Sequence, residues 1–112
     1  MPIFITQGRY TREAVKGMIA KPEDRADAVS RLFAKGGGRL LNYYVTFGDY
    51  DFLLIGEAPS ETQMAAIVLA AASSGGVTGL RTNLALSSIE AKGAFAAAGD
   101  LAPGFRAAGG VS

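Results

Sequence analysis

The chain has neither cysteine nor histidine among its 112 residues. Without cysteine it has no disulfide bonds, no thiolate nucleophile and no soft metal ligand. Without histidine it lacks the usual general base near neutral pH, the histidine-dependent catalytic triads and most zinc, haem and non-haem iron sites. We therefore expect no metal and no cofactor, and any catalysis would depend on carboxylate, tyrosine or arginine side chains.

The sequence also has no long apolar run and no excess of one charge. The net charge is +1, and lysine and arginine are scattered, which argues against a nucleic-acid partner. No apolar run approaches the roughly 18 residues of a membrane span. Met1–Phe4 leads straight into a strand, without the basic region of a signal peptide. We expect a cytoplasmic protein with no membrane partner.

The first half of the chain predicts a strand followed by two helical segments. Residues 3–8 favour a strand, and Thr11 is placed to cap a helix. Pro22 interrupts that helix and can start a second one at its first position. The second segment ends at Lys35, before consecutive glycines that stop a helix.

The second half predicts a β-hairpin, a helix, a strand and a last helix. The hairpin covers residues 43–59. Ser60 and Ser87 each stand three residues before a glutamine or glutamate, the capping-box pattern that opens a helix. A strand over residues 77–86 lies between these helices, and the last helix is expected to end near residue 98.

This order of elements, β-α-β-β-α-β with a terminal helix, predicts an α+β fold. Short connections and right-handed crossovers make a ferredoxin-like sheet with antiparallel strand order 4-1-3-2 the simplest topology. We expect residues 1–98 to form one domain and residues 99–112 to form a flexible tail rich in glycine and alanine.

The third predicted strand is apolar on both faces. Phe52 and Leu54 point to one face, whereas Leu53 and Ile55 point to the other. The helices of one chain cover only one side of the sheet, and each large apolar side chain left exposed forgoes about 1.5–3 kcal/mol. We expect a second copy of the chain to cover the other side, forming a homodimer or a higher oligomer. The alternative is that the C-terminal helix folds back over this face.

The hairpin carries a recognisable signature. Thr46–Asp51, followed by Glu57–Pro59, resembles the motif of the GYD-domain family of small bacterial proteins, and the resemblance extends over about residues 2–95. Supporting matches are Ile5-Thr6, Gly36-Gly37 and Gly79–Thr82.

The resemblance implies a branch of the dimeric α+β-barrel proteins, in which paired ferredoxin-like sheets enclose a cavity. Relatives with that architecture include cofactor-independent oxygenases, isomerases, haem enzymes and ligand-sensing domains of regulators. The family itself has no generally assigned activity. Since a fold does not fix a function, these relatives supply analogies only.

Asp49, Tyr50 and Asp51 are the candidate catalytic residues. One interpretation is structural: Gly48 supplies a positive φ for the turn, and Asp49 hydrogen-bonds the turn backbone. The other is functional, because Asp49 and Asp51 are two residues apart and project to the same side of an extended segment. Such a pair binds a hard cation or shares a proton, but two carboxylates without further oxygen ligands do not predict a metal site.

Four strand residues are candidate ligand-binding residues: Tyr44, Thr46, Arg81 and Thr82. Tyr43 and Tyr44 face opposite sides of their strand, so only one of them can line a cavity between paired sheets. Arg81 either binds an anionic group through its planar guanidinium or protects an edge strand against aggregation.

We also predict where the hairpin turn lies in the fold. We place it at the end of the sheet shared by the N-terminus and the end of the last strand, close to Ser87. Arg9, Tyr10 and Arg12 then lie at the opposite end, so these residues and the turn are not expected to form one site.

The sequence favours a homo-oligomeric domain that binds a small, partly apolar molecule between paired sheets. The alternative is a cofactor-independent enzyme, an oxygenase or isomerase that uses carboxylate and tyrosine side chains. A further alternative is a structural or assembly module whose tail engages a partner. Binding is favoured over catalysis because the sequence shows no activated nucleophile or base.

Overall fold

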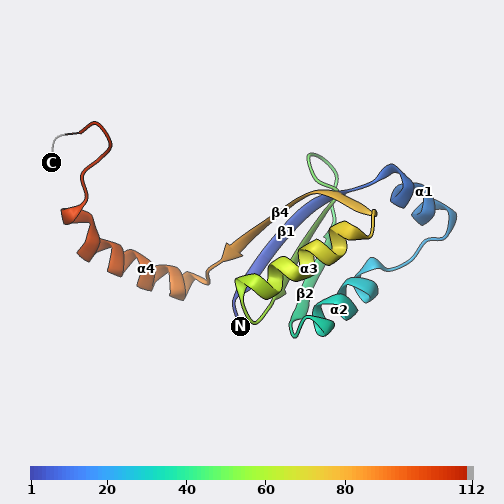
Figure 1. Ribbon diagram of the computed structural model, residues 1–112, viewed down its shortest axis with the longest axis horizontal. Helices are drawn as coiled ribbons and strands as arrows, with labels where there is room; N and C mark the ends of the chain where they lie inside the picture. The colour runs from blue at the N-terminus through green and yellow to red at the C-terminus, as the bar shows by residue number, and fades with distance from the viewer. Residues whose placement is uncertain (111–112) are drawn as a thin grey trace.

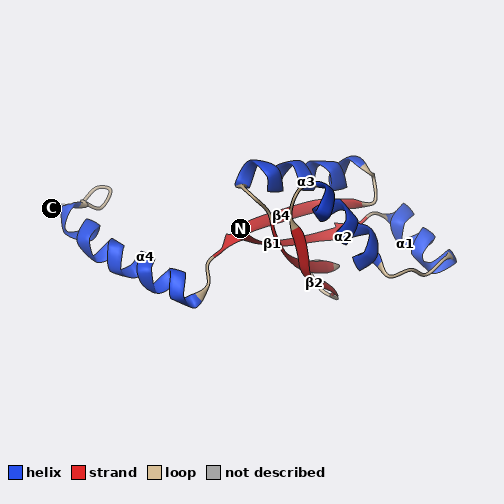
Figure 2. Cartoon of the chain, turned by 90° about the horizontal axis from the view of Figure 1, so that it is seen from below, coloured by secondary structure: helices blue, strands red, loops and turns tan. Residues whose placement is uncertain are grey.

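A four-stranded sheet with helices packed on one face forms the body of the protein, in a computed structural model that describes residues 1–110 (Figure 1, Figure 2). The strands are β1 (Ile3–Tyr10), β2 (Arg39–Val45), β3 (Phe52–Glu57) and β4 (Val77–Ala85). The helices are α1 (Arg12–Ala20), α2 (Arg25–Lys35), α3 (Glu61–Ser73), α4 (Ser88–Leu101) and the short 3-10 helix η1 (Ala102–Gly104). The predicted order of elements is confirmed.

The sheet is antiparallel throughout and has the strand order β2-β3-β1-β4. This is the predicted 4-1-3-2 order read from the other edge, so β1 and β3 are the central strands, as expected. Ile5 of β1, for example, lies opposite Ile55 of β3 on one side and Asn83 of β4 on the other. The α+β fold with an antiparallel sheet is therefore confirmed.

The helices begin where capping side chains satisfy free backbone N–H groups. Thr11 and Ser60 each accept a hydrogen bond from the backbone N–H three residues on. Ser87 forms a complete capping box with the glutamate that follows it. α2 begins later than predicted, because the Asp24 side chain caps it, and Pro22 lies in the link before it.

One face of the sheet forms the hydrophobic core together with α2 and α3. Its buried apolar residues are Phe4, Phe33, Phe52, Leu54, Ala58, Met64 and Ile67. Phe33 of α2 is only 1% exposed and lies against Gly56 of β3. A Cβ atom added at Gly56 would be 2.4 Å from the Phe33 ring, so the glycine makes room for the phenyl group.

The other face of the sheet, which we call the open face, has no helix over it (Figure 2). It carries apolar side chains from both central strands, all of them partly exposed: Ile3, Ile5, Leu53 and Ile55. The predicted alternation along β3 is confirmed, because its other large side chains, Phe52 and Leu54, are buried in the core.

α4 extends away from the sheet and its helices (Figure 1). The radius of gyration is 18.1 Å, whereas about 13 Å is typical of a compact chain of this length. The alternative in which the C-terminal helix covers the open face of its own chain is therefore wrong. A short link after β4 leads into α4, which lies beyond the end of the sheet (Figure 1, Figure 2).

Secondary structure continues past residue 98, the predicted end of the domain. α4 runs on to Leu101, and η1 contains Pro103, which cannot continue an α-helix. The last two residues of the predicted flexible tail, 111–112, lie outside the described residues. No helix in residues 1–110 is long and apolar enough to cross a membrane.

Replacing Gly56 by alanine is expected to destabilise the fold by about 1–3 kcal/mol, because the new methyl group overpacks the core at Phe33. Gly17→Ala is the matched control, since a Cβ atom there meets nothing within 4 Å and the residue lies inside α1. The control is expected to stabilise the protein by about 0.5–1 kcal/mol through helix propensity. Urea unfolding measures both values, and equal stabilities would contradict this packing of Phe33.

Candidate functional site

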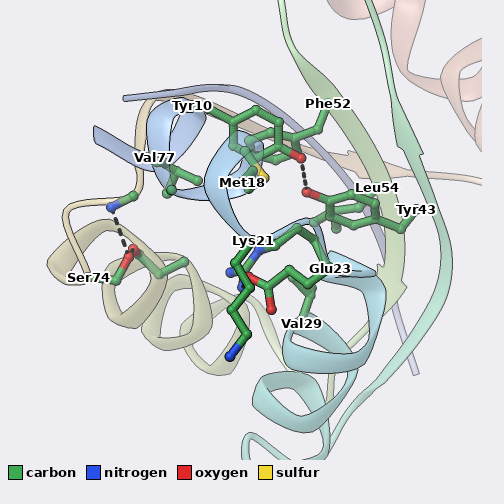
Figure 3. A pocket seen from close by; sticks show the side chains of 15 residues that line it. Tyr10, Met18, Lys21, Glu23, Val29, Tyr43, Phe52, Leu54, Ser74 and Val77 are labelled. Carbon is green, nitrogen blue, oxygen red and sulfur yellow. Dashed lines mark hydrogen bonds and ion pairs between the residues drawn. The ribbon is translucent and has the colours of Figure 1, made fainter. Parts of the chain in front are cut away.

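A pocket of about 460 Å³ lies between the helices and one end of the sheet (Figure 3). Its floor comes from the strands, and its walls come from α1, α2 and the end of α3. Residues of the link between α1 and α2 lie at its rim. Its volume falls in the range of roughly 300–1,000 Å³ that is typical of pockets for small molecules.

Three aromatic rings form the floor of the pocket. The centroid of the Phe52 ring lies 5.3 Å from that of Tyr10 and 5.8 Å from that of Tyr43. The hydroxyl groups of Tyr10 and Tyr43 are hydrogen-bonded to each other (Figure 3). Strand alternation places Tyr43 on this side of the sheet because it pairs with the buried Leu54. The floor is therefore apolar with two hydroxyl groups at one point.

Tyr43 is a neutral phenol at physiological pH. Burial raises its pKa above the ordinary value for tyrosine, and the hydrogen bond with Tyr10 adds to the rise. A phenol with a raised pKa keeps its proton as the pH increases. Tyr43 can therefore exchange hydrogen bonds with a ligand, but it does not act as a base near neutral pH.

The rim of the pocket carries three charged side chains. Arg25 Nη1 and Glu23 Oε1 are 3.1 Å apart, and their side chains are 36% and 53% exposed, so solvent screens the ion pair and it adds little to stability. Lys21 has no ion-pair partner within 4.0 Å in the described chain. The rim therefore has an excess positive charge, which favours an anionic group on a bound molecule.

α1 forms a wall of the pocket without burying any of its own side chains. Ala14, Gly17 and Met18 line the space on this side. An alanine and a glycine leave room that larger side chains would fill. Ala14 and Gly17 thus leave open space on this wall beside the larger side chain of Met18.

The turn between β2 and β3 is anchored to the end of β1 by hydrogen bonds. The Asp51 carboxylate accepts the backbone N–H of Tyr10 at 2.9 Å. The backbone N–H of Asp51 donates to the carbonyl oxygen of Gly8 at 2.8 Å. Arg9 Nε donates to the backbone carbonyl oxygen of Asp49 at 2.8 Å. The turn and the end of β1 thus form one local structure.

This arrangement corrects the predicted position of the turn. The expectation that the turn lies near Ser87 and far from Arg9 and Tyr10 is wrong. Because β1 and β3 are antiparallel, Phe52 at the start of β3 lies opposite Gly8 near the end of β1. Ser87 follows the end of β4 that pairs with the start of β1, which is at the other end of the sheet. Gly48 has a φ of 141°, so the predicted positive φ in the turn is confirmed.

The Tyr50 ring lies near two arginine side chains. The guanidinium carbons of Arg9 and Arg81 are 5.9 Å and 6.0 Å from its centroid, within the range of cation–π contacts. Thr46 Oγ1 donates a hydrogen bond to the carbonyl oxygen of Tyr50 at 2.8 Å. The arginine contacts connect the turn to β1 and β4, and the hydrogen bond lies within the turn.

The candidate ligand-binding residues of the strands lie on two faces of the sheet. Tyr44 and Arg81 belong to the open face, but their strands are the two opposite edges of the sheet. Thr82 lies on the covered face, where its hydroxyl is hydrogen-bonded to that of Thr6 at 2.9 Å. None of these residues, nor Thr46, lines the pocket of Figure 3. Their ligand-binding roles stay predictions.

Comparison with known families agrees with the resemblance carried by the hairpin. The sequence model of the GYD domain matches residues 4–95, which is most of the chain. The chain belongs to the GYD domain family. No curated protein matches its sequence.

Several solved structures are similar to this GYD domain at low sequence identity. The transcriptional regulator NMB0573 from Neisseria meningitidis, in complex with L-Met, has a TM-score of 0.56 and 16% identity, over 79% of this chain and 51% of that one. TTHA0845 from Thermus thermophilus has a TM-score of 0.51 and 18% identity, over 79% and 96% of the two chains. FFRP-DM1 has a TM-score of 0.49 and 15% identity, over 77% and 100%. The feature that this chain shares with NMB0573 and TTHA0845 is the ferredoxin-like α+β fold.

The candidate catalytic residues of this GYD domain all lie in the motif turn. Asp51 is held by Tyr10, whereas the Asp49 carboxylate makes no hydrogen bond within residues 1–110. Neither of them, nor Tyr50, lines the pocket. The described residues also contain no group of three acidic side chains that could hold a metal ion. A catalytic role for the three residues stays a prediction.

Tyr10 and Tyr43 were not predicted as site residues of this GYD domain. A signal was present, because a tyrosine on a covered face keeps a polar tip that needs a hydrogen-bond partner. What the sequence does not contain is the register that brings the two hydroxyls together from β1 and β2, which are separated by β3.

Asp51→Ala is expected to destabilise the protein by about 1–3 kcal/mol, because the partly buried end of β1 loses a charge-assisted hydrogen bond to Tyr10 N–H. Asp49→Ala is the matched control and is expected to change stability by no more than about 0.5 kcal/mol. Thermal and urea unfolding provide the comparison. An Asp49 variant as unstable as the Asp51 variant would show that the anchor is assigned to the wrong carboxylate.

Proposed function

We propose that this GYD domain is a homo-oligomeric domain that binds a small, partly apolar anion in the pocket over Tyr10 and Tyr43. The proposal rests on the composition of that pocket. The aromatic floor provides apolar surface and two hydroxyl groups, and the rim provides the positive charge of Lys21. Binding pockets typically combine such apolar walls with a few polar groups that fix the orientation of the ligand.

A ligand of this kind would be held at two points. Its apolar part would pack on the Phe52 ring and its tyrosine neighbours, where ring surface is available. Its anionic group would lie at the rim near Lys21, whose charge has no partner within residues 1–110. A molecule with a carboxylate or a phosphate a few bonds away from an apolar body fits this arrangement of apolar floor and positive rim.

The similarity to NMB0573 supports binding as a use of this fold. That regulator is in complex with L-Met, a molecule with an apolar side chain and a charged head group. The identity with this chain is only 16%, so the comparison supports the type of activity and not the ligand. The ligand class proposed for the GYD domain comes from its own pocket.

The proposed site differs from the predicted location between paired sheets. The pocket is formed by helices and strands of one chain, so binding does not require a second copy. It also favours binding over catalysis. Tyr43 keeps its proton near neutral pH, and the carboxylates of Asp49 and Asp51 lie outside the lining.

Self-association is the second part of the proposal, and it concerns the open face. Ile5, Leu53 and Ile55 lie there partly exposed and without a covering helix. Two sheets stack at about 10 Å with interdigitated side chains, so the same face of a second copy fits this surface. Such a pair would be the dimeric α+β barrel that the family resemblance implies.

Binding is tested with phenylacetate and its neutral counterpart phenylacetamide. We expect phenylacetate to raise the melting temperature of the protein more than phenylacetamide does, because Lys21 favours the carboxylate. Val29→Trp should abolish the shift by filling the pocket, which Val29 lines. Val15→Trp, on α1 and outside the lining, is the matched control.

The Val29→Trp variant decides whether the ligand binds in this pocket. An equal phenylacetate shift in the folded Val29→Trp variant, checked by circular dichroism, would rule out binding at this site. If Arg81→Ala removes the shift in melting temperature and Val29→Trp does not, the ligand binds at the open face.

Self-association is tested with Ile55→Glu, which places a charge at the centre of the open face. We expect this variant to sediment as a smaller species than the parent protein at micromolar concentration, because a buried unpaired carboxylate opposes stacking. Ile19→Glu, on the exposed surface of α1, is the control and should leave the sedimentation unchanged. A parent protein that is monomeric would refute the pairing of open faces.

A further inference from the structure

α4 carries large apolar side chains on all its sides. Ile89, Phe95 and Leu101 are 82%, 78% and 74% exposed. With about 3.6 residues per turn, side chains six positions apart point in three different directions around the axis. A helix that is apolar all round is normally buried among neighbours. α4 therefore has the surface of a helix that packs against another body.

α4 also needs such a neighbour for its own stability. It is 14 residues long, and isolated helices shorter than about 12–15 residues are marginal in water even when rich in alanine. Gly93 and Gly99 weaken it further. The figures show no strand or long helix of the same chain beside it (Figure 1, Figure 2). A second molecule is the remaining source of packing.

A hollow of about 380 Å³ lies at the base of α4. Leu84 and Leu86, at the end of β4, contribute apolar side chains that are about half exposed. Its lining contains the carboxylates of Glu61 and Glu90 and also Met1, whose N-terminal ammonium group acts on Glu90, so one negative charge is in excess. The hollow is therefore apolar with a negative edge.

We call residues 88–106 the arm. Its far end is apolar and positively charged, which complements the apolar hollow and its negative edge. Leu101 and Phe105 are apolar and exposed, and Arg106 follows them with a positive charge. At 1.5 Å per residue, the 14 residues of α4 hold this end about 21 Å from the helix start. While the helix is formed, its length keeps this end from reaching the hollow at its own base. The base of an antiparallel copy lies at the matching distance.

We propose that two copies of the chain exchange their arms, residues 88–106, with the two α4 helices antiparallel and each far end seated in the hollow at the base of the other arm. Phe95, near the middle of α4, then lies close to the two-fold axis and contacts its counterpart. Arg106 of each chain faces Glu61 of the second copy. This contact is separate from the open face and from the ligand pocket.

The exchange covers enough surface for a stable contact. Each arm exposes four large apolar side chains: Ile89, Phe95, Leu101 and Phe105. Phe95 and Phe105 of each chain lie in the proposed contact, and a buried phenylalanine removes about 150–250 Å² from water. The four rings therefore account for about 600–1,000 Å², and the surfaces that they cover add to this toward the range of about 1,200–2,000 Å² for stable interfaces. A second copy is favoured over another protein because one symmetric contact fills both hollows and covers both arms.

Disulfide cross-linking tests the exchange without interference, since the chain has no cysteine. Full-length Phe105→Cys is mixed with isotope-labelled Leu84→Cys and oxidised mildly. We expect a linked dimer of one labelled and one unlabelled chain, identified by its mass. No such product would overturn the proposal. A chain with both substitutions that links only within itself would show that the arm folds back, which would also overturn it.

Charge variants locate the contact. Phe95→Glu in both chains should lower the yield of the mixed dimer at least roughly tenfold, as expected for a central interface residue. Leu69→Glu, on the exposed side of α3, is the matched control and should leave the yield unchanged. An undiminished yield with Phe95→Glu would exclude the antiparallel pairing.

Two further variants complete the test. Arg106→Glu should lower the yield, and adding Glu61→Arg should restore it by reversing both charges. A yield that does not recover would exclude the proposed position of the far end. Ile55→Glu should leave the cross-link intact, so the result is independent of whether open faces pair.

Discussion

The hydrogen bond from Tyr10 N–H to the Asp51 carboxylate is the contact on which the rest of the candidate site depends. It fixes the motif turn to the end of β1 at 2.9 Å. The side chain of the same Tyr10 then reaches across β3 to the hydroxyl of Tyr43. One residue thus holds the turn through its backbone and the pocket floor through its side chain. Tyr10 is therefore a structural link between the GYD motif and the pocket, although no motif residue lines the pocket.

The parts of the fold that sequence predicted are those set by local rules. Alternation along residues 52–55 identified both faces of β3, and capping patterns at Ser60 and Ser87 identified two helix starts. Glycines after Lys35 marked the end of α2. The strand order followed from short connections and crossover handedness, which act on the chain as a whole. Each of the other signals is contained within a few neighbouring residues.

The parts that were missed depend on distant residues. The position of the turn follows from antiparallel pairing of β1 and β3, and tracing that pairing residue by residue would have placed Asp51 beside Tyr10. The direction of α4 has no such signal, because a helix with apolar residues on every side has no preferred face to pack. The pocket depends on where α1 lies at the end of the sheet, and side chains as small as Ala14 leave no pattern that predicts empty space.

The helix α1 also determines how a small molecule reaches the tyrosines. None of its side chains is buried, so swinging it outward uncovers little apolar area and opposes motion only weakly. It is joined to α2 by a short link that ends at the Asp24 cap. A small molecule would therefore reach the tyrosines by displacement of α1, which costs little buried surface, while the strands of the pocket floor stay in place.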